Sequence, residues 1–495
     1  MHDGLARAAA TFGARDALLA GEARWTFRDL DDASSEFGAY LLAQGVRGGS
    51  RVAVMTSNRP EFVVVVHGIS KIGGAAVLLS PAWKATEVRH ALDVTGPVHA
   101  VADGPGVELL VALLGEESVT DLDRRRPARA HAGAQGVTED HEAVLVFSSG
   151  TTGLPKAVRH THRSIGVATS HWRAALGLGP DDRFQVATPP SHILGLLNLL
   201  AAAAAGASVR LHTRFDLDEV LHRIESERMT LEMAVAPIAL AMANHPDLER
   251  YDLSSLRFIM WGATPVSEHV ARLVSARTGV RWLPAYGASE LPVIACNPVG
   301  DPDSWRLDSA GLPPIGVELR VVDLDTGVVL ADGETGEIQV RSPSVMAGYL
   351  PEEETATAFA GDWYRTGDVG WLEPAGWVHL TDRSKEMIKV NGFQVAPAEV
   401  EEVLRSHPAV LDCAVFGLAD ERAGEVPVAV VQLDPAVPAT AGELQELVAG
   451  SLATYKRIHH VVVVDTIPRL PSGKVLRRTL RDRWSPTLLA GGGAA

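Results

Sequence analysis

The stretch Ser148-Ser149-Gly150-Thr151-Thr152-Gly153-Leu154-Pro155-Lys156 follows an apolar run at 143–147, which predicts a buried strand that ends in a loop. The glycines leave the backbone free to fold around an anion, and the hydroxyl and N–H groups can donate to phosphate oxygens. The GxxxxGKS/T spacing of a Walker loop is absent, so the stretch predicts a phosphate-binding loop of another kind. Taken alone, a flexible turn is an equally good interpretation.

The residues before this loop alternate between strand and helix patterns. The runs 51–55 and 75–79 are short and apolar, and the segment 60–72 between them has a helical pattern. Strand, helix and strand in this order predict a parallel βαβ unit, and hence an α/β fold. The apolar stretch 193–209 is shorter than the roughly 20 residues that a membrane span needs, so it predicts a buried helix.

The composition of the 495 residues is that of a globular protein, with 46% hydrophobic and 21% charged residues. The net charge of −16 argues against nucleic acid and an anionic membrane surface as main partners, because both are bound through clustered Lys and Arg. The two cysteines, Cys296 and Cys413, are far apart, and no signal-peptide pattern begins the chain. We therefore expect a cytoplasmic protein, either a monomer or a homodimer.

Four further motifs follow the loop: Tyr286-Gly287-Ala288-Ser289-Glu290, Tyr364-Arg365-Thr366-Gly367-Asp368, Asp382-Arg383-Ser384-Lys385-Glu386 and Pro471-Ser472-Gly473-Lys474. Together with the loop they resemble the signatures of the adenylate-forming (AMP-binding) superfamily, which includes acyl-CoA synthetases, peptide-synthetase adenylation domains and luciferases. The chain is similar to the acyl-CoA synthetase and 4-coumarate-CoA ligase-like members. The resemblance implies an α/β fold with a large, multi-lobed N-terminal domain at 1–382 and a small, mobile α+β C-terminal domain at 383–495.

The motifs place suitable side chains at the positions that the resemblance assigns. Glu290 offers a hard carboxylate ligand for Mg²⁺ beside a triphosphate. Asp368 offers two acceptors for the hydroxyls of a ribose, with Arg383 as its expected neighbour. Lys474 would stabilise the negative charge that develops when pyrophosphate leaves the α-phosphorus. By resemblance, His192 lies between the phosphate loop and the acyl pocket.

The resemblance also implies the complete set of site residues, with Lys474 and His192 as the catalytic ones. The expected ATP- and AMP-binding residues are Ser148, Ser149, Gly150, Thr151, Thr152, Gly153, Lys156, Gly262, Ala263, Ala285, Tyr286, Gly287, Ser289, Asp368 and Arg383. The expected acyl pocket consists of Ser191, His192, Trp261, Gly262, Ala285, Gly287, Pro292 and Val293. The expected path for a thiol passes Lys385, Lys389, Asn391, Gly392 and Phe393.

Some residues depart from the family pattern. Pro284 stands where many relatives have Gln or Asn, so adenine must be recognised through backbone groups. Trp261 and Ala285 are bulkier than the usual Ser and Gly, which predicts a short pocket. No carboxylate stands at His192-Ile193 to pair with an ammonium, which argues against an α-amino acid substrate. These features favour an uncharged, flat acyl group, such as an arylacrylic or benzoic acid, or a short-to-medium aliphatic chain.

The function that follows has two steps. A small carboxylic acid and Mg-ATP give acyl-AMP and pyrophosphate, and a thiol, in the first place CoA, then displaces AMP. A carrier protein, an amine or another small nucleophile are alternative acceptors that attack the same adenylate. A catalytically silent nucleotide-binding protein is disfavoured because Glu290, Asp368 and Lys474 are all present.

Overall fold

The structure, a computed structural model, describes residues 1–124, 136–148, 155–262, 266–383, 385–391, 393–420, 422–470 and 473–491. The predicted βαβ unit is confirmed: α3 (Pro60–Lys71) connects β3 (Arg51–Met55) to β4 (Ala75–Leu78). The two strands pair in parallel, with Val52 beside Ala76. Almost every residue of α3 is buried, as its continuous apolar sequence requires.

The first sheet contains this unit and carries the phosphate loop. Its strand order is β17-β8-β7-β4-β3-β5-β6. The further strands are β5 (His99–Ala102), β6 (Val119–Asp121), β7 (Glu142–Ser148), β8 (Lys156–Thr161) and β17 (Gly348–Leu350). β7 and β8 are antiparallel with Ser148 opposite Lys156, so the two described ends of the predicted phosphate loop lie beside each other.

A second large sheet has the order β14-β13-β12-β11-β9-β10-β1-β2. Its strands are β1 (Asp16–Ala20), β2 (Ala23–Thr26), β9 (Arg183–Val186), β10 (Ser208–Leu211), β11 (Leu231–Ala234), β12 (Phe258–Trp261), β13 (Trp282–Tyr286) and β14 (Ala295–Cys296). One apolar cluster joins residues of both sheets, and it includes most of α7 (Ile193–Ala205). The prediction of a buried helix here is confirmed.

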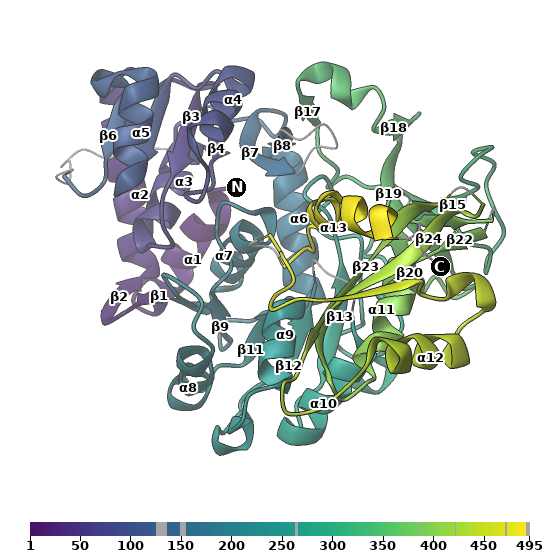
Figure 1. The fold of residues 1–495 in the computed structure, drawn as a ribbon. Coiled ribbons are helices and arrows are strands. Elements are labelled where there is room, and N and C mark those ends of the chain that lie inside the picture. The colour runs from purple at the N-terminus through teal and green to yellow at the C-terminus, as the bar shows by residue number, and fades with distance from the viewer. Residues whose placement is uncertain are drawn as a thin grey trace.

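The other helices of this region cover the sheets (Figure 1). They are α1 (Asp3–Phe12), α2 (Phe27–Ala43), α4 (Ala85–Thr95), α5 (Pro105–Leu114), α6 (His162–Ala175), α8 (Leu217–Glu227), α9 (Ala236–Ala243) and α10 (Glu268–Thr278). A smaller antiparallel sheet follows, formed by β15 (Glu318–Val322), β16 (Gly336–Arg341), β18 (Phe359–Ala360), β19 (Trp363–Leu372) and β20 (Val378–Arg383). Among the described residues, no helix combines the length and apolar character that a membrane crossing requires.

The C-terminal elements, yellow-green to yellow in Figure 1, form an α+β unit as predicted. They are β21 (Ile388–Val390), β22 (Phe393–Val395), α11 (Pro397–Arg405), β23 (Val410–Asp420), β24 (Gly424–Leu433), α12 (Ala441–Ser451), β25 (His460–Val463) and α13 (Arg477–Gly491). In the part of the chain that the structure describes, the buried apolar clusters separate at this point. Three lie before residue 379 and two lie after residue 387. On this separation we propose the domain boundary at 382/383.

The second sheet contains a buried polar network around Glu232 on β11. Gln185 Nε2 donates to Glu232 Oε2 at 2.9 Å, and Gln185 Oε1 lies 2.6 Å from His212 Nε2. Glu232 is 3% exposed. Because burial penalises the carboxylate, the pKa of Glu232 is raised to about 8.

This raised pKa predicts a pH-dependent stability. Between about pH 4.5 and about pH 8 the folded protein keeps a proton on Glu232 that the unfolded chain releases, so the free energy of unfolding falls as pH rises through this interval. Glu232→Gln cannot ionise, and its Tm should fall less than that of the wild type over the same pH range. The exposed Glu446 provides the control, since Glu446→Gln should keep the wild-type slope. Equal slopes for wild type and Glu232→Gln would contradict the assignment.

Candidate active site

Three of the predicted nucleotide-binding residues meet at the buried carboxylate of Asp368. Arg383 on β20 lies opposite Asp368 on β19 in the strand register, and its Nε approaches Asp368 Oδ1 to 2.7 Å. Tyr286, at the end of β13, donates from its hydroxyl to Asp368 Oδ2 at 2.5 Å. Burial raises the pKa of Asp368, and the Arg383 charge and the Tyr286 hydrogen bond oppose that rise. The carboxylate is therefore fixed in one orientation with lone pairs left for ribose hydroxyls.

Glu290 lies beside this group and is held from several directions. It is 7% exposed, and the Tyr349 hydroxyl donates to its Oε1 at 2.8 Å. Its main-chain carbonyl accepts from Met346, and the carbonyl of Ser289 lies 2.8 Å from His160 Nε2. The charge of Glu290 also contributes to the raised pKa of Asp368, which places both carboxylates in one electrostatic environment.

Lys474 reaches the same group from the C-terminal domain. Its loop packs on the large domain, because a Cβ added at Gly473 would lie 2.8 Å from Pro237 Cδ at the start of α9. Gly473 also has a φ of +85°, which favours glycine. Burial, followed by the charge of Arg383, lowers the pKa of Lys474, whereas Glu386 and Asp368 oppose this shift. The ammonium lies 3.7 Å from Glu386 Oε1.

The phosphate loop is described only at its ends. Ser148 closes β7 and Lys156 opens β8. The Lys156 ammonium is paired with Glu354 and lies 5.3 Å from the centroid of the Tyr349 ring. Its charge is thus compensated within the protein, in the same region as Glu290. The predicted residues that lie outside the described part of the chain are Ser149, Gly150, Thr151, Thr152, Gly153, Ala263 and Gly392.

Two turns carry the predicted acyl-pocket residues. A Cβ at Gly287 would lie 2.1 Å from the Pro292 carbonyl oxygen, so glycine is required there, and Val293 is fully buried. His192 is the N-cap residue of α7, and its main-chain N–H donates to the Pro189 carbonyl at 3.0 Å. Burial lowers the pKa of His192, which favours the neutral imidazole.

Ser191 is 8% exposed, and within the described residues its hydroxyl oxygen has no hydrogen-bond partner. An unpaired buried hydroxyl is costly, so this group is available to a bound molecule.

The prediction that Trp261 and Ala285 border one pocket is wrong. Trp261 is paired with Pro284 in the strand register, and its ring packs on Trp282 with centroids 5.1 Å apart, in the apolar cluster under α8, α9 and α10. Ala285 instead packs against the cluster that contains Met260 and Tyr286. Neighbouring residues of a strand point to opposite faces, so Met260, and not Trp261, shares the face of Ala285.

The residues of the expected thiol path lie at the start of the C-terminal domain. Lys385 and Lys389 are exposed, and the Lys389 N–H donates to Glu425 at 2.8 Å. Asn391 has a φ of +51°, and the 55% exposed Phe393 ring stacks on Tyr455 with centroids 4.6 Å apart. Lys385 precedes β21, Lys389 lies on β21 and Phe393 begins β22.

Tyr349 and Met260 are site residues that the sequence did not identify. Tyr349 comes from β17, and no sequence motif links it to Glu290. Met260 could have been found by applying the two-residue period of a strand to 258–261.

Comparisons with known proteins agree with this geometry. The model of the AMP-binding enzyme family matches residues 5–350, and that of the AMP-binding enzyme C-terminal domain matches residues 399–474. 4-Coumarate–CoA ligase 2 of Oryza sativa subsp. japonica is 36% identical over 487 residues, covering 90% of this chain and 85% of the relative.

Two solved structures have the same fold over nearly their whole length. An anthranilate CoA ligase, AuaEII, in complex with anthranoyl-AMP superposes with a TM-score of 0.91 at 26% identity, covering 99% of this chain and 98% of the other. The amide bond synthetase McbA of Marinactinospora thermotolerans gives a TM-score of 0.88 at 30% identity, covering 98% and 100%. The fold, the cluster around Asp368 and both family matches lead to one conclusion: the chain belongs to the adenylate-forming, AMP-binding enzyme family.

Proposed function

We propose that this chain is an AMP-forming acid–thiol ligase that activates an aromatic or arylacrylic acid with Mg-ATP and transfers the acyl group to CoA. The observation that carries the proposal is the position of Lys474. Its ammonium interacts electrostatically with Asp368, although Asp368 belongs to the large domain and Lys474 to the C-terminal domain. A ligase needs a cation at this point during the adenylation step, when charge develops on the α-phosphoryl oxygens.

The residues present fit a magnesium ion. Glu290 supplies a buried carboxylate with a second oxygen beyond the one bound by Tyr349, and Mg²⁺ is usually held by one or two carboxylates together with substrate phosphates. When bound, the ion would neutralise phosphate charge. Among the described residues no group of three or more His, Cys, Asp or Glu side chains could hold a metal by itself, so the phosphates have to complete the site.

In the first step a carboxylate oxygen of the substrate attacks the α-phosphorus, and the bond to the bridging oxygen of pyrophosphate breaks. Asp368 and Arg383 hold the ribose, and Lys474 compensates the developing charge. In the second step the thiolate sulfur attacks the acyl carbonyl, and AMP leaves with the electrons of the carbon–oxygen bond. By resemblance, His192, which is the N-cap residue of α7 and whose neutral form is favoured by burial, lies between the phosphate loop and the acyl pocket.

The substrate class rests on the pocket face that Ala285 and Met260 share. Met260 belongs to the apolar cluster against which Ala285 packs, and the backbone at Gly287 lies too close to the Pro292 carbonyl to allow a side chain. Several relatives are named for 4-coumarate, a flat arylacrylic acid. An extended aliphatic chain would need a deeper cavity.

The proposal is tested by pyrophosphate release with cinnamate, 4-coumarate, benzoate, hexanoate and palmitate, each with and without CoA. We expect the highest kcat/KM for an arylacrylic or benzoic acid, and the acyl-CoA should form in equal amount to AMP. A preference for palmitate would show that the pocket opens elsewhere. Pyrophosphate release that depends on an amine and not on CoA would favour the amide-forming reaction for which McbA is named.

Lys474→Ala tests the role of the C-terminal lysine. Acyl-AMP formation should fall by roughly 10²–10³, the scale for the loss of one donor to a transition state. Supplied with prepared acyl-AMP, the variant should still transfer the acyl group to CoA, because the second step does not use this ammonium. An equal loss in both half-reactions would refute the assignment.

Gly392→Leu tests the thiol path, which is proposed from the resemblance and from the exposure of the neighbouring residues Asn391 and Phe393. The leucine side chain should obstruct the thiol, so acyl-CoA formation should be lost while pyrophosphate release persists. Gly450→Leu, at an exposed helix position with open space around it, is a control for the size of the substitution. If Gly392→Leu forms acyl-CoA at the wild-type rate, the acceptor does not pass this residue.

A further inference from the structure

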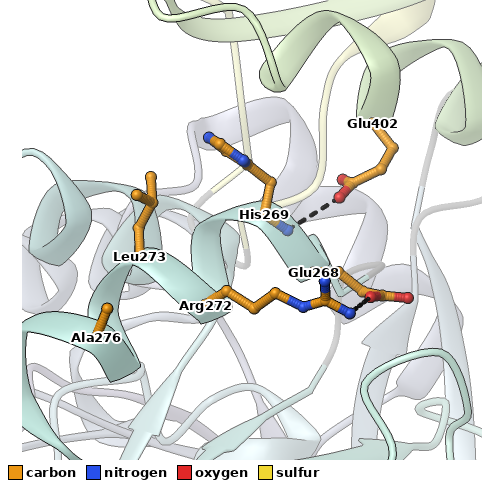
Figure 2. Close-up of a pocket in the computed structure, with 6 residues that line it drawn as sticks. All are labelled: Glu268, His269, Arg272, Leu273, Ala276 and Glu402. Carbon is orange, nitrogen blue, oxygen red and sulfur yellow. Dashed lines mark hydrogen bonds and ion pairs between the residues drawn. The ribbon is translucent and has the colours of Figure 1, made fainter.

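A groove of about 510 Å³ lies between the two domains, and none of its lining residues belongs to the predicted nucleotide-binding set. Its walls are α10 of the large domain and Glu402 on α11 of the C-terminal domain, as Figure 2 shows. The lining residues are Glu268, His269, Arg272, Leu273, Ala276 and Glu402. One hydrogen bond between the two domains crosses this groove.

The hydrogen bond uses an N–H group that α10 cannot satisfy internally. The first N–H groups of a helix have no acceptor in the preceding turn. The side-chain hydroxyl of Ser267, the N-cap residue, accepts the N–H of Val270 at 3.4 Å. The N–H of His269 donates instead to Glu402 Oε1 at 3.0 Å, across the domain boundary (Figure 2).

The charge of Glu402 suits this position. A helix N-terminus carries a partial positive charge and stabilises a nearby carboxylate. Glu268, the acidic residue of the first turn, is engaged elsewhere, because Arg272 holds its carboxylate at 2.6 Å. Glu402 Oε2 lies 4.0 Å from Arg405 Nη1, which makes this ion pair a weak one. Its side chain is 36% exposed, so the bond is open to water and salt.

The contact between Glu402 and α10 also depends on the orientation of the C-terminal domain. The start of α11 is bound to Asp382, the last residue of the large domain, because the N–H of Ala398 in its first turn donates to Asp382 Oδ2 at 2.9 Å. One helical turn later, Glu402 reaches α10. A rotation of the C-terminal domain about Asp382 would therefore move α11 relative to α10 and separate Glu402 from His269.

We infer that Glu402 is a positioning residue for adenylation: it caps α10 from the other domain and stabilises the orientation in which Lys474 faces Asp368. The inference rests on the proposed function, because that orientation matters only if Lys474 acts in the first step. The bond is present in the orientation that the structure has, so it should favour adenylation without assisting transfer to the thiol.

The test compares Glu402→Ala, Glu402→Gln and the control Glu446→Ala, which removes an exposed carboxylate from α12 of the same domain. Single-turnover pyrophosphate release should slow by roughly three- to tenfold in Glu402→Ala, the scale of one charge-assisted hydrogen bond that is partly open to solvent. Glu402→Gln should slow less, because its amide oxygen still accepts. Transfer from prepared acyl-AMP to CoA should be unchanged in all three variants.

Salt gives a second readout that a purely structural role would not produce. Added NaCl should slow adenylation by the wild type and by Glu446→Ala more than by Glu402→Ala, because only the first two retain the charge at the N-terminus of α10. Equal losses in both half-reactions, or a wild-type adenylation rate in Glu402→Ala, would overturn the inference. A wild-type enzyme that releases no pyrophosphate with any carboxylic acid would instead overturn the proposed function.

Discussion

Asp368 holds a carboxylate in the protein interior, where an uncompensated charge would cost several kcal/mol, on the order of the desolvation penalty of a buried ion. Arg383 supplies the opposite charge, and Tyr286 a hydrogen bond, so the three motifs that carry these residues have to meet in one place. β13, β19 and β20 come from two different sheets, and this contact fixes them relative to one another. The orientation of the Asp368 carboxylate, which we propose binds a ribose, follows from that requirement.

The contact between Asp368 and Arg383 lies next to the start of the C-terminal domain. Arg383 follows Asp382, whose carboxylate accepts from the N–H groups of Arg383 and Ala398 at 2.7 and 2.9 Å. Asp382 and Arg383, which are consecutive, thus connect the proposed nucleotide site to the start of α11. Lys474 approaches from the far side of the C-terminal domain, and Gly473 allows its loop to pack on Pro237. In the proposed function, the first step depends on this docking, because it brings Lys474 to the group around Asp368.

Much of this arrangement could be predicted from the sequence, for a physical reason. Each motif combines glycine or a hydroxyl residue with one charged side chain at fixed spacing. The backbone conformation of such a short segment is largely determined by its own residues. The βαβ unit at 51–79 and the buried α7 were predicted for the same kind of reason, from periodicity and length. Family membership followed from the motifs and is confirmed by the matches at 5–350 and 399–474.

The features that the sequence did not reveal are contacts between distant segments. Tyr349 meets Glu290, and Glu402 meets α10, because sheets and domains come together, and no local pattern records either contact. The error at Trp261 has a different origin. The face on which this side chain lies depends on the strand register with Pro284 and on the packing against Trp282.

The central claim is that the carboxylate is activated as an acyl-adenylate, and isotope transfer tests it most directly. With a carboxylic acid labelled with ¹⁸O in both carboxylate oxygens, one labelled oxygen should appear in AMP after acyl transfer, because the bond from that oxygen to the α-phosphorus persists when AMP leaves. Mass spectrometry of the AMP measures this. Label found in inorganic phosphate, with ADP as the nucleotide product, would indicate an acyl-phosphate intermediate and would contradict the account.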